Sequence, residues 1–166
     1  MGAVGASVSQ ESLNHSILNR TNIRTMLQQL SVFIENKSGT LLQILELLKS
    51  AGIQLVATNI VDTMDYGICR IIATQPRLAC TILQEAGMSA NLNDVFAIEL
   101  DNHPGSAADA IAAFAQEGVG IIYLYSFLLG GKGVLIFRTD NPERAQAIIT
   151  ENHLNALDEQ TLTSLT

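Results

Sequence analysis

The sequence is poor in charged residues, in aromatic side chains and in cysteine. Only 15% of its 166 residues are charged, whereas an average globular protein has about 25%. Lysine and arginine total 9 against 16 aspartates and glutamates, a formal net charge of −7. Basic patches bind phosphate backbones and anionic membrane surfaces, so we expect neither a nucleic acid nor a membrane as partner. Tryptophan is absent and aromatics make up 5%, which also disfavours base-stacking surfaces.

Motifs that carry chemistry are also missing. The two cysteines, Cys69 and Cys80, form no CxxC pair, and His15, His103 and His153 are scattered without the spacing of metal ligands. The sequence shows no nucleophile–base–orienter set and no paired carboxylates in equivalent loops. We therefore expect no catalytic residues, no metal site and no cofactor, in a protein that binds rather than catalyses.

Long apolar runs are absent as well. No run reaches the roughly 18 residues of a membrane-spanning helix, and the N-terminus lacks the basic flank and leucine-rich core of a signal peptide. We expect a cytoplasmic chain with reduced, buried cysteines. The sequence is nevertheless 48% hydrophobic, which excludes a disordered chain and exceeds what one thin domain shell would require.

The chain contains an internal repeat. The segment Glu35-Asn36-Lys37-Ser38-Gly39 resembles Asp101-Asn102-His103-Pro104-Gly105, at an offset of 105 − 39 = 66 residues. The same offset places Gly52 on Gly118, Gly67 on Gly133, Pro76 on Pro142 and Ala79 on Ala145. Because one shift aligns turn, strand and helix-start signals in order, we infer two copies of one unit, which meet near Asp94.

Each copy shows the same order of elements. Apolar periodicity in the first predicts a strand, a helix, two strands, a second helix that starts at Pro76, and a short strand after Gly87. The second copy repeats this pattern, with Asn141 as the N-cap of its second helix and a weak final strand over 157–162. The predicted fold class is α+β: two ferredoxin-like βαββαβ units in tandem, with antiparallel sheets and helices on one face. The predicted boundaries are 1–26 for a flexible N-terminal arm, 27–93 for the first unit and 94–166 for the second.

Two tyrosines in the second copy share one face of a strand. Tyr123 and Tyr125 are two residues apart on the strand predicted over 119–127, so their side chains point to the same side of the sheet. We expect them to pack in an interface between units or between chains. The segment Gly130-Gly131-Lys132-Gly133 lacks the spacing of a phosphate-binding loop, and we interpret it as a hairpin turn.

These segments resemble a known family. A strand followed by Glu35-Asn36-Lys37-Ser38-Gly39-Thr40-Leu41 and a helix resembles the opening of an ACT domain, the small-ligand regulatory module of amino-acid metabolism. In the second copy, Asp101-Asn102-His103-Pro104-Gly105 is closer still to the family's usual Asn/Asp-x-Pro-Gly turn, whereas Ser38 stands where proline is usual. The resemblance covers about residues 27–163 and is to stand-alone tandem ACT proteins.

The resemblance implies a ligand site at the strand–helix loops. ACT domains typically bind an amino acid or similar effector at the interface between paired domains, near the first such loop. A glycine there lets the backbone approach a ligand, and helix N-terminal amides suit a carboxylate. The candidate ligand-binding residues are Asn36, Gly39, Thr40, Leu41, Asn102, His103, Pro104, Gly105 and Ser106.

Other interpretations of these residues stay open. Asn36 and Asn102 are also typical of helix-entry turns, and His103 is also explained as a solvated loop residue. Thr40 and Ser106 are also suited to capping their own helices.

By resemblance, the function is that of a non-enzymatic, amino-acid-binding regulatory protein. The alternative is a detached regulatory subunit that controls a biosynthetic enzyme such as acetolactate synthase. A small enzyme on the same frame is a third class, because a fold alone does not determine function. Each unit covers only one sheet face with its own helices, and sheet edges remain to be paired, so we expect a homodimer.

Overall fold

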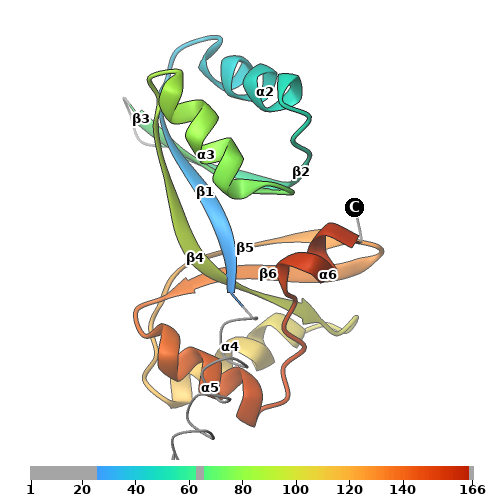
Figure 1. Cartoon of the computed structure of the whole chain (residues 1–166). Helices are drawn as coiled ribbons and strands as arrows, with labels where there is room; N and C mark the ends of the chain where they lie inside the picture. Colours follow the sequence, from blue (N-terminus) through green and yellow to red (C-terminus); the bar gives the residue numbers. More distant parts are fainter. Residues whose placement is uncertain (1–25, 63–65, 165–166) are drawn as a thin grey trace, which may run out of the picture.

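The computed structural model describes residues 26–62 and 66–164, which form six strands and five helices (Figure 1). Their chain order contains the βαββα pattern twice, as the repeat predicts. The elements are β1 (Met26–Glu35), α2 (Thr40–Ser50), β2 (Leu55–Asp62), β3 (Tyr66–Ala73), α3 (Pro76–Glu85), β4 (Ser89–Leu100), α4 (Ser106–Gln116), β5 (Ile121–Leu129), β6 (Lys132–Thr139), α5 (Pro142–Glu151) and α6 (Glu159–Ser164).

The starts of the second helices follow from local sequence. Pro76 and Pro142 each occupy the first turn of a helix, where the missing N–H costs nothing. The side chain of Asn141 accepts a hydrogen bond from the Arg144 N–H at 3.1 Å, so its predicted role as N-cap of α5 is confirmed.

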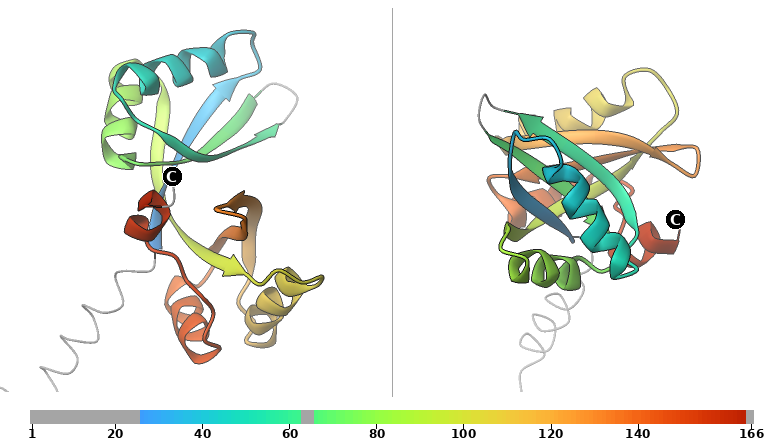
Figure 2. Two further views of the ribbon diagram at one scale, coloured as in Figure 1. Left: turned by 90° about the vertical axis from the view of Figure 1, so that its right-hand side faces the viewer. Right: turned by 90° about the horizontal axis from the view of Figure 1, so that it is seen from above.

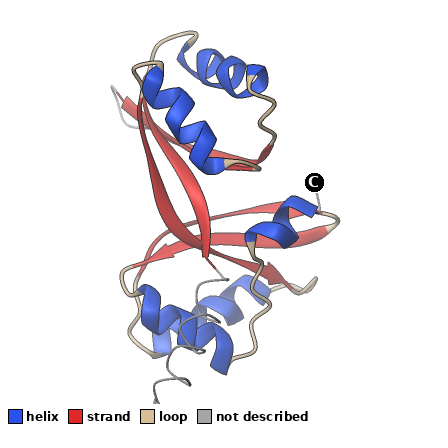
Figure 3. Ribbon diagram, in the orientation of Figure 1, coloured by secondary structure: helices blue, strands red, loops and turns tan. Residues whose placement is uncertain are grey.

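All six strands belong to one antiparallel sheet in the order β2-β3-β1-β4-β6-β5 (Figure 3). At its centre β1 pairs with β4, and the register places Gln28 opposite Asp94. Those two residues are 66 apart and therefore correspond to each other in the repeat; their side chains are hydrogen bonded. The two copies are thus related by a local two-fold axis near Gln28 and Asp94, with β1, β3 and β2 corresponding to β4, β6 and β5.

The strand β4 serves both copies. Its first residues are the last strand of the first unit, and its later residues begin the second unit, so the predicted meeting point at Asp94 lies inside a strand of 12 residues. The two ferredoxin-like units therefore share one sheet instead of forming two.

The predicted final strand over 157–162 is wrong, because that segment enters α6. Its beginning still follows the repeat: Ile98 forms a single bridge with Ala156, as Val32 pairs with Ala90 in the first unit. Beyond this bridge the edge of β4 is already paired with β1, whose Met26 lies opposite Phe96. A strand that continued past the bridge would collide with β1, so the chain leaves the sheet.

The apolar residues form three clusters. The helices α2 and α3 cover one sheet face in the first unit, and α4 and α5 cover the same face in the second (Figure 1). In the second unit Phe137 stacks on Phe96 and meets Phe114 edge-on, with ring centroids 5.6 and 5.0 Å away. The third cluster lies on the opposite face, where buried residues of β1, β3, β4, β5, β6 and α6 bring the two units together. Figure 2 shows the arrangement of these elements from two further sides. The predicted α+β fold is confirmed, with α2 to α5 on one face. The short helix α6 is the exception, because its Leu162 belongs to the third cluster on the opposite face.

The predicted arm lies almost entirely outside the described residues. Met26, which we expected as its last residue, is already the first residue of β1 and packs against the second unit's cluster. Among the described residues, no helix is long and apolar enough to span a bilayer.

Candidate functional site

The two strand–helix loops have the same backbone geometry. Gly39 has φ 96° and ψ −18°, and Gly105 has φ 95° and ψ −10°, in the left-handed region that favours glycine. The Thr40 N–H donates to the Lys37 carbonyl and the Ser106 N–H to the His103 carbonyl, both at 3.3 Å. The repeat is therefore preserved at the atomic level in the loops that the sequence singled out.

Both helices begin without a side-chain cap. Neither α2 nor α4 has a capping side chain, and the hydroxyls of Thr40 and Ser106 make no hydrogen bond to another described residue. The interpretation of these two residues as caps is therefore wrong. Uncapped amides and the positive end of the helix dipole favour an anionic group, such as a carboxylate, at each loop.

The first loop is tied to its own sheet. Asn36 donates a hydrogen bond to the Asp62 carboxylate, and its side-chain oxygen lies beside Gly67, where a Cβ would come within 3.5 Å of it. Leu41 is half-buried and packs against the first unit's cluster. These contacts give both candidate residues a structural role in the chain as it stands.

The second loop is more open. Asn102, His103, Pro104 and Gly105 are all exposed, and the His103 ring Nδ1 lies 3.1 Å from the Pro104 carbonyl oxygen. No side chain from the rest of the described chain restrains this loop as Asp62 restrains Asn36.

The two loops lie at opposite ends of the central strand pair (Figure 1). Met26 of β1 lies opposite Phe96 of β4, and the two strands run in opposite directions from this pair. The first loop follows Glu35, nine residues beyond Met26, and the second follows Leu100, four residues beyond Phe96. At about 3.3 Å per residue, the loops are roughly 40 Å apart along the strands. The structure therefore does not bring the first and second sets of candidate residues together within one chain.

A cleft of about 360 Å³ lies beside the second loop. This is within the usual size range of small-molecule sites. Of the candidate residues, His103 and Ser106 line it, whereas Asn102, Pro104 and Gly105 do not. Its other walls come from the end of β4, one face of α4 and the segment Asn152–Asn155, which follows α5 and which sequence reasoning did not select.

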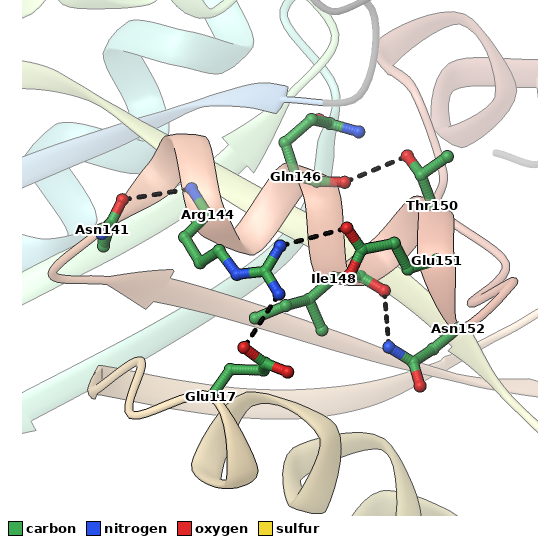
Figure 4. A network of polar contacts seen from close by, with 8 residues as sticks. All are labelled: Glu117, Asn141, Arg144, Gln146, Ile148, Thr150, Glu151 and Asn152. Atoms are coloured by element: carbon green, nitrogen blue, oxygen red, sulfur yellow. Dashed lines mark hydrogen bonds and ion pairs between the residues drawn. The ribbon is translucent and has the colours of Figure 1, made fainter.

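A polar network ties α5, the helix that precedes one wall of this cleft, to the end of α4 (Figure 4). Arg144 on α5 binds Glu117, just after α4, at 2.8 Å and Glu151, at the end of α5, at 3.1 Å. These two carboxylates, Glu117 first, raise the pKa of the Arg144 guanidinium, so it stays charged. Asn152 then donates to the Ile148 carbonyl at 3.0 Å and closes the helix where the cleft begins.

The predicted interface role of the two tyrosines is confirmed within the chain. The Gln29 side-chain amide donates to the Tyr123 hydroxyl at 2.8 Å, and the Tyr125 hydroxyl donates back to Gln29 at 3.0 Å. The Arg70 guanidinium lies over the Tyr123 ring, 3.9 Å from its centroid. Gln29 and Arg70 were missed by sequence reasoning; a glutamine beside Leu27 and Leu30 in an apolar strand was the available signal.

Titratable residues do not cluster into a metal site. Within 26–62 and 66–164, no group of three or more histidine, cysteine, aspartate or glutamate side chains has the arrangement to hold a metal ion. Cys69 and Cys80 are buried and unpaired with each other, and burial raises the pKa of both thiols.

Comparison with known proteins agrees with this geometry. A family model described as an ACT domain pair matches residues 25–166, which is most of the chain. The chain belongs to the ACT domain family. The βαββαβ units and their glycine loops are thus those of two ACT domains that share a sheet.

Solved structures of other proteins are similar. The ACT pair is 32% identical to protein BT0572 from Bacteroides thetaiotaomicron, with a TM-score of 0.81 over 86% of this chain and 99% of that one. The regulatory subunit of aspartate kinase from Thermus thermophilus has the same fold, with 16% identity and a TM-score of 0.55 over 77% of this chain and 93% of that chain. No curated protein matches the sequence.

Proposed function

We propose that this ACT pair is a non-enzymatic, cytoplasmic regulatory protein of amino-acid metabolism that binds an amino acid or a similar small effector. The observation that carries the proposal is the duplicated loop: Gly39 and Gly105 have the same left-handed geometry, each before an uncapped helix. Such a loop offers backbone amides to the carboxylate of a zwitterion. No side chain of the described residues restrains the Asn102 amide, so it can bind the polar groups of the ligand as well.

The proposed effector site lies between ACT units of two chains. The two loops of one chain are too far apart to share a ligand, so a ligand that lies between ACT units at one loop would have its second wall in another copy of the chain. A ligand that contacts both copies would favour one arrangement of the units over others. This is how effector binding would be passed to a downstream partner.

The second candidate function is a regulatory subunit that binds and controls a biosynthetic enzyme, such as acetolactate synthase. The observation that favours it is an uncovered apolar row on the edge strand β5, where Ile122, Leu124 and Leu128 are 55%, 48% and 79% exposed. An enzyme subunit is the occupant of this row under this second function, and a second copy of the chain is the competing occupant, which sedimentation tests.

Isothermal titration calorimetry against the twenty amino acids tests the proposed function. At least one amino acid should bind the wild-type protein, and Gly105→Ala should weaken that binding. The matched control is Gly118→Ala at the other end of α4, since Gly118 also has a positive φ, 70°, and open space around its Cβ position. No heat of binding across the panel would overturn the proposal.

A further inference from the structure

The second unit contains a cleft because it has small residues where the first unit has large ones. The α4 residues Ser106, Asp109, Ala110 and Ala113 form one helix face that lines the cleft. Sixty-six positions earlier, α2 carries Ile44 and Leu47 in place of the two alanines. Ile44 is fully buried and Leu47 packs against the first unit's cluster, so these side chains fill the corresponding space. The cleft is therefore a feature of the second unit and not a property of the repeat.

The wall of the cleft opposite α4 also differs between the two units: the second unit has a histidine where the first has a glycine. His153, which lines the cleft, has φ 53° and is the one non-glycine residue with positive φ among the described residues. Its counterpart in the first unit is Gly87, with φ 81°, which adopts this conformation without a side-chain penalty. The left-handed conformation costs an L-residue roughly 1–2 kcal/mol, and it costs polar residues less. The backbone of the second unit is therefore strained at His153, the position that places an imidazole at the rim of the cleft.

The lining is apolar at its floor and acidic at its rim. Ile98, Leu100 and Leu154 contribute apolar surface, and no lysine or arginine lines the cleft. Glu99 is neutralised by Lys132 at 2.7 Å, on the other face of β4. Asp101 and Asp109, by contrast, have no ion-pair partner in the part of the chain that the structure describes. The two carboxylates and the apolar floor match a ligand with a positive charge and an apolar body.

We propose that the cleft between α4 and Asn152–Asn155 is a second binding site, specific to the second unit, for a small organic ammonium ion with an apolar body. The ammonium lies at Asp101 and Asp109, and the apolar part covers Ala110 and Ala113. Every wall comes from one chain, so this site needs no partner copy. It shares His103 and Ser106 with the candidate loop residues and goes beyond the proposed effector site in its other walls, on α4, β4 and 152–155.

The probes that test this site are butylamine and butyrate, which have similar size and opposite charge. Amide resonances of the wild-type full-length protein, followed by NMR in buffer of constant ionic strength, should shift at Ser106–Ala113 and Asn152–Asn155 on addition of butylamine. The shifts should saturate. Butyrate should give no saturable shift in these segments at the same concentrations.

Two variants and one control sharpen the test. Ala113→Leu installs the first unit's residue and should weaken butylamine binding at least tenfold by filling the cleft. Asp109→Asn, at an exposed position, should weaken it about threefold to fivefold, the size expected for one partly solvated ion pair. The control is Ala107→Leu, which also installs the first unit's residue, Leu41, but at an exposed position of α4 outside the cleft; its affinity should equal that of the wild type.

Butyrate binding as tightly as butylamine would overturn the proposal, and so would wild-type affinity in both Ala113→Leu and Asp109→Asn. The loop site is tested separately, because Ala113→Leu leaves both glycine loops intact and should not change the binding of the calorimetric ligand. Loss of that ligand only in Gly105→Ala, and of butylamine only in Ala113→Leu, distinguishes the two sites.

Discussion

The Tyr125 hydroxyl of the second unit donates a hydrogen bond to the side-chain oxygen of Gln29 in the first, at 3.0 Å. Gln29 is completely buried, and its amide nitrogen in turn donates to the hydroxyls of Tyr123 and Ser31, at 2.8 and 3.1 Å. A buried amide with both ends satisfied fixes the geometry of its neighbours, because any other arrangement leaves a polar group without a partner. This contact therefore helps to hold the two units in one relative orientation.

Removing one hydroxyl should destabilise the interface between the units. Tyr125→Phe leaves the Gln29 oxygen buried without its donor, which costs about 1 to 3 kcal/mol of unfolding free energy. Gln29→Met removes both polar ends at nearly constant volume. The two substitutions should combine less than additively in urea denaturation, because they remove the same hydrogen bond. Strict additivity would contradict the proposed coupling.

Stability should fall at alkaline pH through the same residue. Burial, followed by the nearby Tyr123, raises the pKa of Tyr125 above its ordinary value of 10.0, while Arg70 opposes this rise. Above about pH 10 the unfolded chain loses a phenolic proton that the folded chain retains. The stabilising contribution is therefore complete below pH 10 and is lost as pH rises beyond it, by up to about 1.4 kcal/mol per pH unit.

Urea denaturation at pH 8 and at pH 10.5 measures this loss. Tyr125→Phe removes the phenol, so its unfolding free energy should decrease less between the two pH values than that of the wild type. Burial of Cys69 adds a second alkaline contribution to both proteins, so the difference between them isolates Tyr125. Equal decreases in the two proteins would contradict the assignment.

The repeat predicted most of the secondary structure, because each helix, strand and turn is indicated by residues close together in the sequence. Gly39 and Gly105, Pro76 and Pro142, and the apolar periodicity of each strand and helix are signals that neighbouring residues carry themselves. The pairing of β1 with β4 is not local: it depends on the register that places Gln28 opposite Asp94 across the two copies. Only this register shows that no strand can continue after Ala156, because β1 already occupies that edge of β4. The sequence pattern therefore predicted the units but not their fusion into one sheet.

The site was predicted less completely, for a related reason. The loops were found because glycine with positive φ has a strong local signature. The cleft exists because α4 has small side chains. Ala110 and Ala113 are common in helices and give no signal alone; only comparison with their counterparts Ile44 and Leu47 shows that large side chains are missing there. Its far wall, Asn152–Asn155, comes near α4 only through the packing of α5. A position-by-position comparison of the two copies was the signal that could have found it.

Substitution of the loop glycines should cost stability without any steric clash. Gly39→Ala and Gly105→Ala place an L-residue at φ 96° and 95°, although nothing lies within 4 Å of the added Cβ. The cost is therefore one of backbone conformation, about 1 to 2 kcal/mol of unfolding free energy for each. Asparagine tolerates this region better, so Gly39→Asn should be less destabilising than Gly39→Ala in thermal denaturation. The opposite order would show that contacts, and not backbone conformation, determine the effect.

The exposed row on β5 should determine the oligomeric state. Leu124 and Leu128 lie on one face of an edge strand, 48% and 79% exposed, and an edge strand also presents unpaired backbone groups. If a second copy covers this edge, the wild-type protein sediments at twice the 17.8 kDa chain mass.

Charge should prevent that pairing. Leu124→Lys with Leu128→Lys should sediment as a monomer with unchanged secondary structure, because two ammonium groups would be buried without partners in the dimer. Leu42→Lys is the control, since Leu42 is 58% exposed on α2, away from β5, and this variant should remain dimeric. A wild-type monomer at micromolar concentration would contradict the homodimer and leave an enzyme subunit as the candidate partner of this edge.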